Sequence, residues 1–335
     1  MTRREFIAAS AAAPLAAPAA VRCKMGFAPD AFAVSRPPRT AIEFLDHAYA
    51  VGGGGVQAEL ASLDPAYVRQ VRRRLEELGM YLVVLADPPK EEDLPRFEAT
   101  VRAAREAGAD CIRTACLIGR RYETFETLDQ WKSFAADFRA RLERAARVAE
   151  KHRFPIAVEN HKDWTIDEME PMLKEIGSEY LGVCLDFGNN ISLLDDADEL
   201  VDRLGPFAIN AHIKDMGVEE YEEGFLLAEV PLGQGILNLK RTVGVLQKAR
   251  PNIKFTLDVF TRNPLKIPCL TDKYWATFPE RNGLFLARAL SMVRKNKPAK
   301  PFPILDGLDQ AARLKLETYN VEQSLAYART ELKLV

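Results

Sequence analysis

This 335-residue chain has little excess charge of either sign, no apolar run long enough to cross a membrane, and few cysteines. Its 46 lysines and arginines nearly balance 48 aspartates and glutamates. The resulting net charge of -2 gives no reason to expect nucleic acid or an anionic membrane surface as a partner. The longest apolar run, near the amino terminus, is too short to span a membrane stably. What remains is a 47% hydrophobic chain that can build a sizeable globular core.

Cysteine is also sparse. The five cysteines contain no Cys-x-x-Cys pair and do not form a disulfide framework. Cys111 and Cys116 lie five positions apart on one expected strand, so they face opposite sides and should not bridge each other. We interpret Cys111, Cys116 and Cys184 as buried thiols.

The first 20 residues differ in composition from the rest. Arg3 and Arg4 precede an alanine-rich run, with small residues where a signal peptidase would cut. Segment 1–20 resembles a twin-arginine export signal, which implies cleavage after Ala19 or Ala20 and an exported, periplasmic protein without membrane attachment. An ordinary amphipathic helix is the alternative, although two prolines interrupt it.

Alternating strand and helix patterns fill the body of the chain. Segments rich in β-branched and aromatic residues predict strands at 26–34, 55–60, 81–87, 111–117, 156–160, 181–187, 207–215 and 253–260. Helical patterns lie near 41–50, 65–78, 94–107, 128–152, 166–176, 196–204, 238–249 and 280–295. This order predicts an α/β fold, a parallel (β/α)8 TIM barrel over 26–297. A doubly wound open sheet is the alternative.

Two segments lie outside the regular alternation. Residues 216–235 alternate polar and apolar side chains and are interpreted as a hairpin or lid beside the mouth, or as a solvated edge. Residues 298–335 predict a C-terminal helical extension, one or two short helices that strap the barrel or mediate formation of a homo-oligomer.

Four potential metal ligands lie near the ends of the last four expected strands: Glu159, Asp186, His212 and Asp258. Barrel active sites collect at the carboxyl ends of the strands, where these side chains would converge. Three carboxylates and one imidazole suit Mn²⁺, Co²⁺, Zn²⁺ or Mg²⁺. Any one of these carboxylates alone could be a helix cap or a surface charge. The four together favour a metal site.

Neighbouring side chains are expected at the same mouth, because residues two apart on a strand share a face. His161 should lie near Glu159, and Lys214 should lie near His212. Arg113, in an otherwise apolar strand, should point inwards, where it is ion-paired or serves an anionic ligand. Trp164 could cover the apolar face of a sugar. Each of these residues also has a structural interpretation. His161 could be a histidine whose ring nitrogens are hydrogen-bonded within the fold, Lys214 a surface lysine, and Trp164 a residue that packs a loop.

These segments together resemble the xylose-isomerase-like barrel superfamily of sugar isomerases and epimerases. The matching motifs are Glu159-Asn160-His161, Leu185-Asp186-Phe187-Gly188, His212-Ile213-Lys214-Asp215 and the glycine turn Pro231-Leu232-Gly233-Gln234-Gly235. The sequence departs from the family at Asp258, where relatives carry Glu, and at Asn189, where many carry a histidine that binds metal or substrate.

The resemblance implies a metal-dependent sugar isomerase or epimerase that removes a proton next to a carbonyl and forms an ene-diolate. We expect Glu159 to be the base and Asp258 to be a ligand and possible second acid or base. Lys214 would stabilise oxyanion charge, while His161 and Asn189 would contact the sugar or keto-sugar substrate.

Two other functional classes remain open. A lyase or dehydratase could use the same enolate, and a non-catalytic carbohydrate-binding barrel is compatible with the shorter side chain of Asp258. The apurinic-endonuclease branch of the superfamily is disfavoured, because its trinuclear zinc site needs more than the four histidines present and its DNA surface more basic charge.

Overall fold

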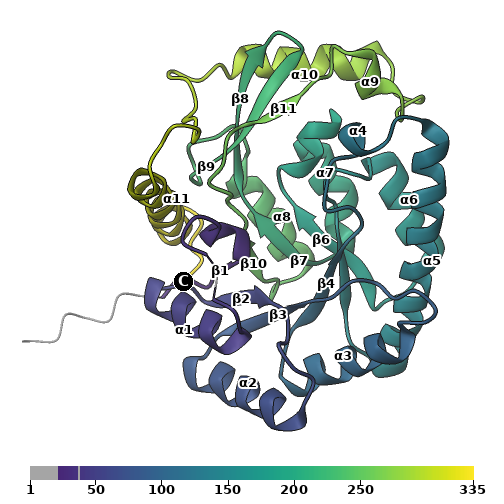
Figure 1. Ribbon diagram of the computed structural model, residues 1–335, viewed down its shortest axis with the longest axis vertical. Coiled ribbons are helices and arrows are strands. Elements are labelled where there is room, and N and C mark those ends of the chain that lie inside the picture. Colours follow the sequence, from purple (N-terminus) through teal and green to yellow (C-terminus); the bar gives the residue numbers. More distant parts are fainter. Residues whose placement is uncertain (1–21, 37) are drawn as a thin grey trace, which may run out of the picture.

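The fold is a closed barrel of parallel strands, seen in a computed structural model that describes residues 22–36 and 38–335. The export signal expected at 1–20 lies outside the described residues. The strands follow the order β1-β10-β7-β6-β5-β4-β3-β2 (Figure 1). They are β1 (Gly26–Phe27), β2 (Gly55–Ala58), β3 (Tyr81–Leu85), β4 (Cys111–Ala115), β5 (Ile156–Glu159), β6 (Leu181–Asp186), β7 (Ala208–Ile213) and β10 (Phe255–Leu257). The predicted (β/α)8 barrel is confirmed.

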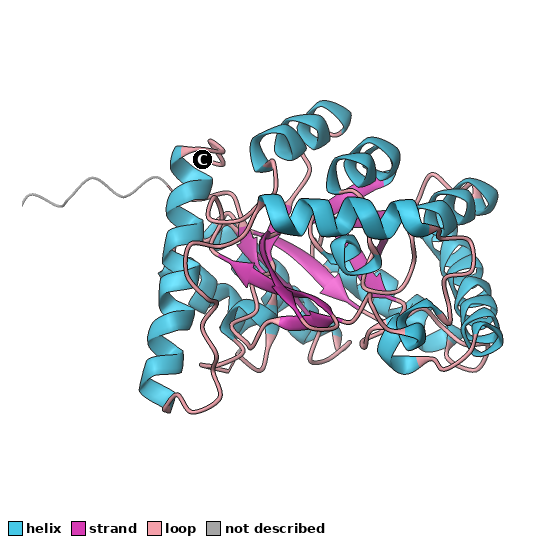
Figure 2. Cartoon of the chain, turned by 90° about the horizontal axis from the view of Figure 1, so that it is seen from above, coloured by secondary structure: helices cyan, strands magenta, loops and turns pink. Residues whose placement is uncertain are grey.

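Helices surround the strands (Figure 2). They are α1 (Ala41–Val51), α2 (Pro65–Leu78), α3 (Leu94–Glu106), α5 (Leu128–His152), α6 (Ile166–Ile176), α7 (Ala197–Leu204) and α8 (Leu239–Ala249). Local capping fixes several of the predicted boundaries: the Asp64 carboxylate accepts the Ala66 N–H at 2.8 Å and starts α2. Thr127 starts α5 with a capping box.

The first strand is shorter than the sequence predicts. It ends at Phe27, and the 3-10 helix η1 (Pro29–Phe32) follows where residues 28–34 were expected to be extended. Pro29 has no N–H to donate to a neighbouring strand and is well suited to the first turn of a helix, so the prediction was wrong there.

The segment after β7 forms the predicted hairpin. Strands β8 (Asp215–Tyr221) and β9 (Gly224–Val230) pair antiparallel, and β11 (Leu265–Ile267) joins β9. Helices α9 (Asp272–Trp275) and α10 (Gly283–Lys295) lie near this small sheet at the top of Figure 1, and α10 packs on β8 and β9. The helix predicted at 280–295 therefore covers the hairpin rather than the barrel.

The C-terminal extension is one long helix, α11 (Gln310–Thr330), rather than one or two short ones. Near its C-terminal end, Glu331 pairs with Lys240 of α8 at 2.7 Å. At its other side, the Glu317 carboxylate accepts the N–H groups of Val34 and Ser35 just after η1. Its residues Val321, Leu325 and Ala328 belong to the main core. This helix therefore straps the barrel between α8 and η1, as one of the two alternatives predicted.

The barrel interior below the mouth is lined by Tyr81, Val83, Cys111, Ala157, Cys184 and Ile209. Cys111 and Cys184 are buried there as free thiols, as predicted. Cys116 is only half-buried, because β4 ends at Ala115 and Cys116 begins the following loop. In the part of the chain that the structure describes, no helix combines the length and the apolar character needed to cross a membrane.

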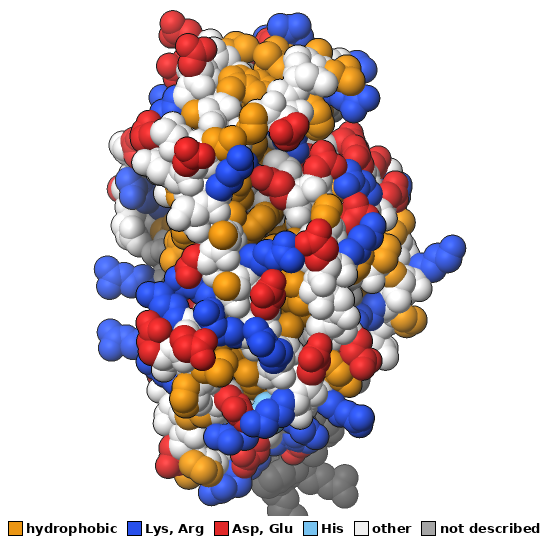
Figure 3. All heavy atoms as spheres, turned by 90° about the vertical axis from the view of Figure 1, so that its right-hand side faces the viewer, with side chains coloured by type: hydrophobic (Ala, Val, Ile, Leu, Met, Phe, Trp, Pro, Cys, Tyr) orange, Lys and Arg blue, Asp and Glu red, His pale blue; other side chains and the backbone are white. Residues whose placement is uncertain are grey.

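Charges of both signs are interspersed on the face that includes α5 and α6 (Figure 3). Arg139 of α5 pairs there with Glu175 of α6 at 2.7 Å. No single sign dominates this face.

Candidate metal and substrate site

The four predicted ligands converge at the mouth of the barrel. Their ligand atoms all lie within 4.8 Å of one another. His212 Nδ1 lies 3.4 Å from Glu159 Oε2, 3.6 Å from Asp186 Oδ2 and 3.7 Å from Asp258 Oδ2. Each side chain is at or just beyond the carboxyl end of its strand, and the register places Asp186 directly opposite His212. We call these four residues the quartet.

The donor atoms of the quartet fit a divalent metal. His212 Nδ1 is buried and has no hydrogen-bond partner, a costly state for a polar atom, while the facing oxygens Glu159 Oε2 and Asp186 Oδ2 are buried against the cationic groups of Arg113 and Lys214. Ligands about 2.1 Å from a tetrahedral ion lie roughly 3.4 Å apart, close to the spacing found here. The quartet could therefore hold such an ion with little rearrangement.

The imidazole of His212 is oriented for this role. Its Nε2 lies 2.8 Å from Gln57 Oε1 on β2, a contact in which Nε2–H donates. A hydrogen bond at one ring nitrogen fixes the tautomer and leaves the other nitrogen free to bind metal. Burial lowers the pKa of His212, but Cys184 and Asp186 outweigh this effect and raise it to about 10. The surroundings of Nδ1 therefore favour a cation, either a proton or a metal ion.

Lys214 lies beside the quartet, as predicted. Its Nζ is 2.5 Å from Asp258 Oδ2 and 2.9 Å from Asp186 Oδ2, and its side chain is buried. Burial alone would lower the pKa of Lys214, but the two carboxylates raise it above the usual range. Burial would also raise the pKa of Asp258, yet Lys214 and His212 hold it well below the usual range.

Arg113 and Asn189 both contact Glu159. Arg113 points into the barrel from β4 and forms an ion pair with Glu159 Oε2. Asn189 lies in the 3-10 helix η2 (Asn189–Leu193), and its Nδ2 donates to Glu159 Oε1 at 3.0 Å. The structure thus brings both predicted substrate-binding residues to the quartet, where they fix the orientation of the Glu159 carboxylate.

The predicted contacts in the loop after β5 differ in their placement. His161 is half-buried, its Nδ1 has no partner, and burial followed by the charge of Lys162 lowers its pKa well below the usual value. It is therefore neutral near pH 7. Trp164 is buried in the main core and packs edge-on against Trp131, with 5.2 Å between the ring centroids. This placement gives no support to its predicted contact with a sugar.

Asp215, the last residue of the His212–Asp215 motif, holds the backbone of a neighbouring loop in place. Its carboxylate accepts four backbone N–H groups, those of Met216, Gly233, Gly235 and Leu237. These bonds tie the glycine turn after β9 to the start of β8. The motif at 231–235 therefore shapes the loop beside the mouth.

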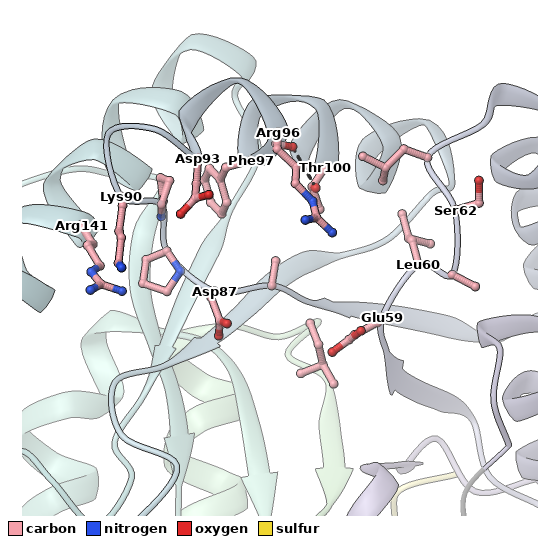
Figure 4. Close-up of a pocket in the computed structure, with 16 residues that line it drawn as sticks. Glu59, Leu60, Ser62, Asp87, Lys90, Asp93, Arg96, Phe97, Thr100 and Arg141 are labelled. Carbon is pink, nitrogen blue, oxygen red and sulfur yellow. Dashed lines mark hydrogen bonds between the residues drawn. The ribbon is translucent and has the colours of Figure 1, made fainter.

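A cavity of about 590 Å³ opens at the same rim beside β2 and β3 (Figure 4). Glu59 follows β2 on one side, Lys90 and Arg141 lie on the other, and α3 forms the roof. Leu85 lines the cavity and pairs with Arg113 across β3 and β4. The cavity therefore borders the Arg113 side of the quartet.

Lys162 and Gln57 belong to the site although their roles were not predicted. Lys162 is buried, and its Nζ donates to Asn189 Oδ1 at 2.5 Å. Its backbone carbonyl accepts the Arg121 N–H at 2.9 Å, which holds the loop in place. Alternation along β5 assigns Lys162 to the face opposite Glu159, but the strand ends at Glu159 and the rule no longer applies. Gln57 could have been predicted as a site residue, because it is a polar residue inside a short apolar strand.

Comparisons with known proteins agree with this geometry. The family described as "Xylose isomerase-like TIM barrel" matches residues 45–277. The 3-oxo-isoapionate decarboxylase of Pectobacterium atrosepticum is 25% identical over 198 residues, which cover 58% of this chain and 66% of that protein. The match thus leaves about a third of that relative uncovered.

Two solved structures are similar in fold. A D-psicose 3-epimerase in the presence of D-fructose has 14% sequence identity and a TM-score of 0.59, covering 92% of this chain and 99% of that one. A xylose isomerase-like barrel protein from Mycobacterium smegmatis in complex with magnesium has 14% sequence identity and a TM-score of 0.51. The match covers 75% of this chain and 89% of that one. Since the family match spans more than half of the sequence, this chain belongs to the xylose isomerase-like TIM barrel family.

Proposed function

We propose that this protein is a divalent-metal-dependent isomerase or epimerase that acts on a sugar or keto-sugar by removing a proton next to the carbonyl. The observation that carries the proposal is the convergence of three buried potential ligand atoms, Glu159 Oε2, Asp186 Oδ2 and the unpartnered His212 Nδ1, at ligand spacing. A bound metal would supply Lewis acidity that lowers the pKa of the substrate proton and stabilises the ene-diolate.

The side chains around the quartet support a single proton-transfer group, Glu159. Asn189 and Arg113 orient Glu159 without adding a second base, so Glu159 is the proposed acceptor of the substrate proton. The ammonium of Lys214, fixed between two carboxylates, would stabilise negative charge that develops on a substrate oxygen. His161, neutral and with a free ring nitrogen, is a candidate hydrogen-bond partner for a hydroxyl group.

Asp258 bears on the choice of reaction. Lys214 binds this carboxylate at 2.5 Å and lowers its pKa, which makes Asp258 a poor acceptor for a second substrate proton. This favours reactions that need one base, an isomerisation or the loss of a group next to the same enolate. A lyase is therefore the second candidate, and the name of the curated relative, a decarboxylase, supports the same kind of intermediate.

The decisive experiment combines metal analysis with solvent deuterium exchange. Purified protein loaded with Mn²⁺ should introduce deuterium into D-fructose or a related ketose at the carbon next to the carbonyl. Glu159→Gln should retain most of the metal and lose exchange, while Lys174→Met, on the exposed surface of α6, should behave as the parent protein. Full exchange by Glu159→Gln would show that Glu159 is not the base. Neither metal nor exchange in the parent protein would favour a carbohydrate-binding barrel.

We also propose export through the twin-arginine pathway, on the sequence of residues 1–20 alone. Replacing Arg3 and Arg4 with lysine should retain the full-length precursor inside the cell. Cell fractionation and the mass of the exported chain test this, and an unprocessed amino terminus on exported protein would contradict it.

A further inference from the structure

Buried cations in this protein are rare, and one of them lacks an anion. In the part of the chain that the structure describes, three lysine or arginine residues are fully buried: Arg121, Lys162 and Lys214. Arg121 pairs with Glu168 at 2.6 Å, and Lys214 pairs with two carboxylates of the quartet. Within the described residues, no carboxylate oxygen lies within 4 Å of Lys162 Nζ.

Lys162 is also short of hydrogen-bond acceptors. An ammonium group offers three donors, and toward the described residues Lys162 uses one of them, in the hydrogen bond to Asn189 Oδ1. Burying a charged group without a counter-ion is unfavourable, and burial followed by the charge of Lys214 lowers the pKa of Lys162 to about 8. The side chain thus remains largely charged near pH 7, at a cost to the stability of the fold.

The carboxylates around Lys162 are already neutralised by other cations. Asp186 and Asp258 share Lys214, and Glu159 pairs with Arg113. Glu229 of β9 forms an ion pair with Arg262, and the carboxylate of the adjacent Asp163 accepts the backbone N–H groups of Leu117 and Trp164 instead. No neighbouring anion is left to pair with Lys162 alone.

Lys162 is placed where a substrate would be. Its Nζ bonds the same Asn189 side chain whose amide nitrogen holds Glu159, so one residue separates the ammonium from the proposed base. A substrate whose reacting carbon approaches Glu159 would bring its neighbouring atoms within reach of this charge. The missing counter-ion is therefore expected from the substrate.

We propose that the substrate is an acid, a polyhydroxylated keto acid whose carboxylate forms an ion pair with Lys162 while its carbonyl lies at the quartet. The inference rests on the proposed function and adds to it the chemical class of the substrate. Neutral ketoses would bind and react more weakly, because they leave Lys162 without an anion.

The test compares matched acid and neutral probes on the metal-loaded protein. D-fructuronate and D-fructose, together with D-tagaturonate and D-tagatose, differ at one terminal carbon, which is a carboxylate in the acids. Calorimetric titration should show at least about tenfold tighter binding of one acid over its neutral partner. This ratio should fall to near one in Lys162→Met and in Lys162→Gln, recover in part in Lys162→Arg, and stay unchanged in Lys174→Met.

Two outcomes would overturn the inference: no acid preference in the parent protein for either pair, or an undiminished preference in both Lys162 variants. Thermal unfolding of each variant establishes that it is folded before titration. Failure of the proposed function has a different signature. Acid preference that depends on Lys162, without deuterium exchange into any probe, would remove the enolisation chemistry and keep the carboxylate contact. Deuterium exchange without a preference for acids would keep the enolisation chemistry and remove the carboxylate contact.

Discussion

Two buried lysines at the same mouth have opposite electrostatic surroundings. Lys214 and Lys162 both approach Asn189 Oδ1, at 3.4 and 2.5 Å. Lys214 lies between two carboxylates that raise its pKa, whereas burial lowers that of Lys162 to about 8. The side of the mouth formed by β7 and β10 is thus neutralised by the protein itself. The side formed by the loop after β5 keeps a charge that a ligand can neutralise.

The largest effect is expected for Lys214→Met in metal-free protein. The substitution leaves Asp186 and Asp258 buried without their shared cation, and breaking a buried ion pair in this way costs about 3–5 kcal/mol. Urea unfolding at pH 7 measures the loss, with Lys174→Met as the exposed control. A loss below about 1 kcal/mol would mean that Lys214 is not held by the quartet.

Lys162→Met should change stability in the other direction. At pH 7 the variant should unfold at higher urea than the parent, by up to about 3 kcal/mol if the pKa is lowered from 10.5 to about 8. The charged or titratable groups around Lys162 are Lys214, Asp186, Asp258, Glu229, Arg262, Asp163 and His161. A less stable variant at pH 7 would show that an unrecognised anion already pairs with Lys162.

The same pair of proteins gives a pH test. Below pH 8, Lys162 is protonated in the folded and the unfolded chain, so its burial cost is constant. From pH 8 to about 10.5 the folded chain loses this proton while the unfolded chain keeps it, so the parent gains stability as pH rises. The advantage of Lys162→Met should therefore shrink over this interval. An advantage that is constant from pH 7 to 10.5 would contradict the lowered pKa.

A smaller effect is expected on the neutralised side from Gln57→Leu. Without Gln57 Oε1, His212 loses the hydrogen bond that fixes its tautomer, and the loss of such a partner typically weakens metal binding about 10- to 100-fold. Competition with a fluorescent chelator measures the affinity, with Gln234→Leu near α11 as the control. Equal affinities in parent and variant would exclude an orienting role for Gln57.

The smallest effect should come from Trp164→Phe, which asks whether the loop after β5 binds substrate through more than Lys162. Because Trp164 packs against Trp131, the change should cost about 1–2 kcal/mol of stability and alter KM by less than about twofold. Urea unfolding and steady-state kinetics measure the two quantities. A large rise in KM with unchanged stability would restore the predicted sugar contact.

Periodicity and strand ends made most of this fold predictable. Glu159, Asp186 and His212 lie on strands whose apolar pattern defines both the carboxyl end and the inward face, so their convergence follows from the barrel. The capped helices follow equally from local signals such as Asp64.

The misses share a cause, because they lie where no strand or helix imposes a period. Cys116 directly follows the end of β4, and Lys162 lies in the loop that begins after Glu159, the last residue of β5. The position of helix α11 could not be predicted, because it depends on which surface of the barrel the other helices leave uncovered. Such placements depend on tertiary packing that spacing along the chain does not encode.

Metal titration tests the central claim, that the quartet binds a divalent ion, most directly. Metal-free protein titrated with Mn²⁺ should bind one ion per chain. Asp186→Asn and His212→Ala should each abolish that binding while Lys174→Met retains it. Absence of a bound ion in the parent protein, or unchanged stoichiometry and affinity in both quartet variants, would contradict the account.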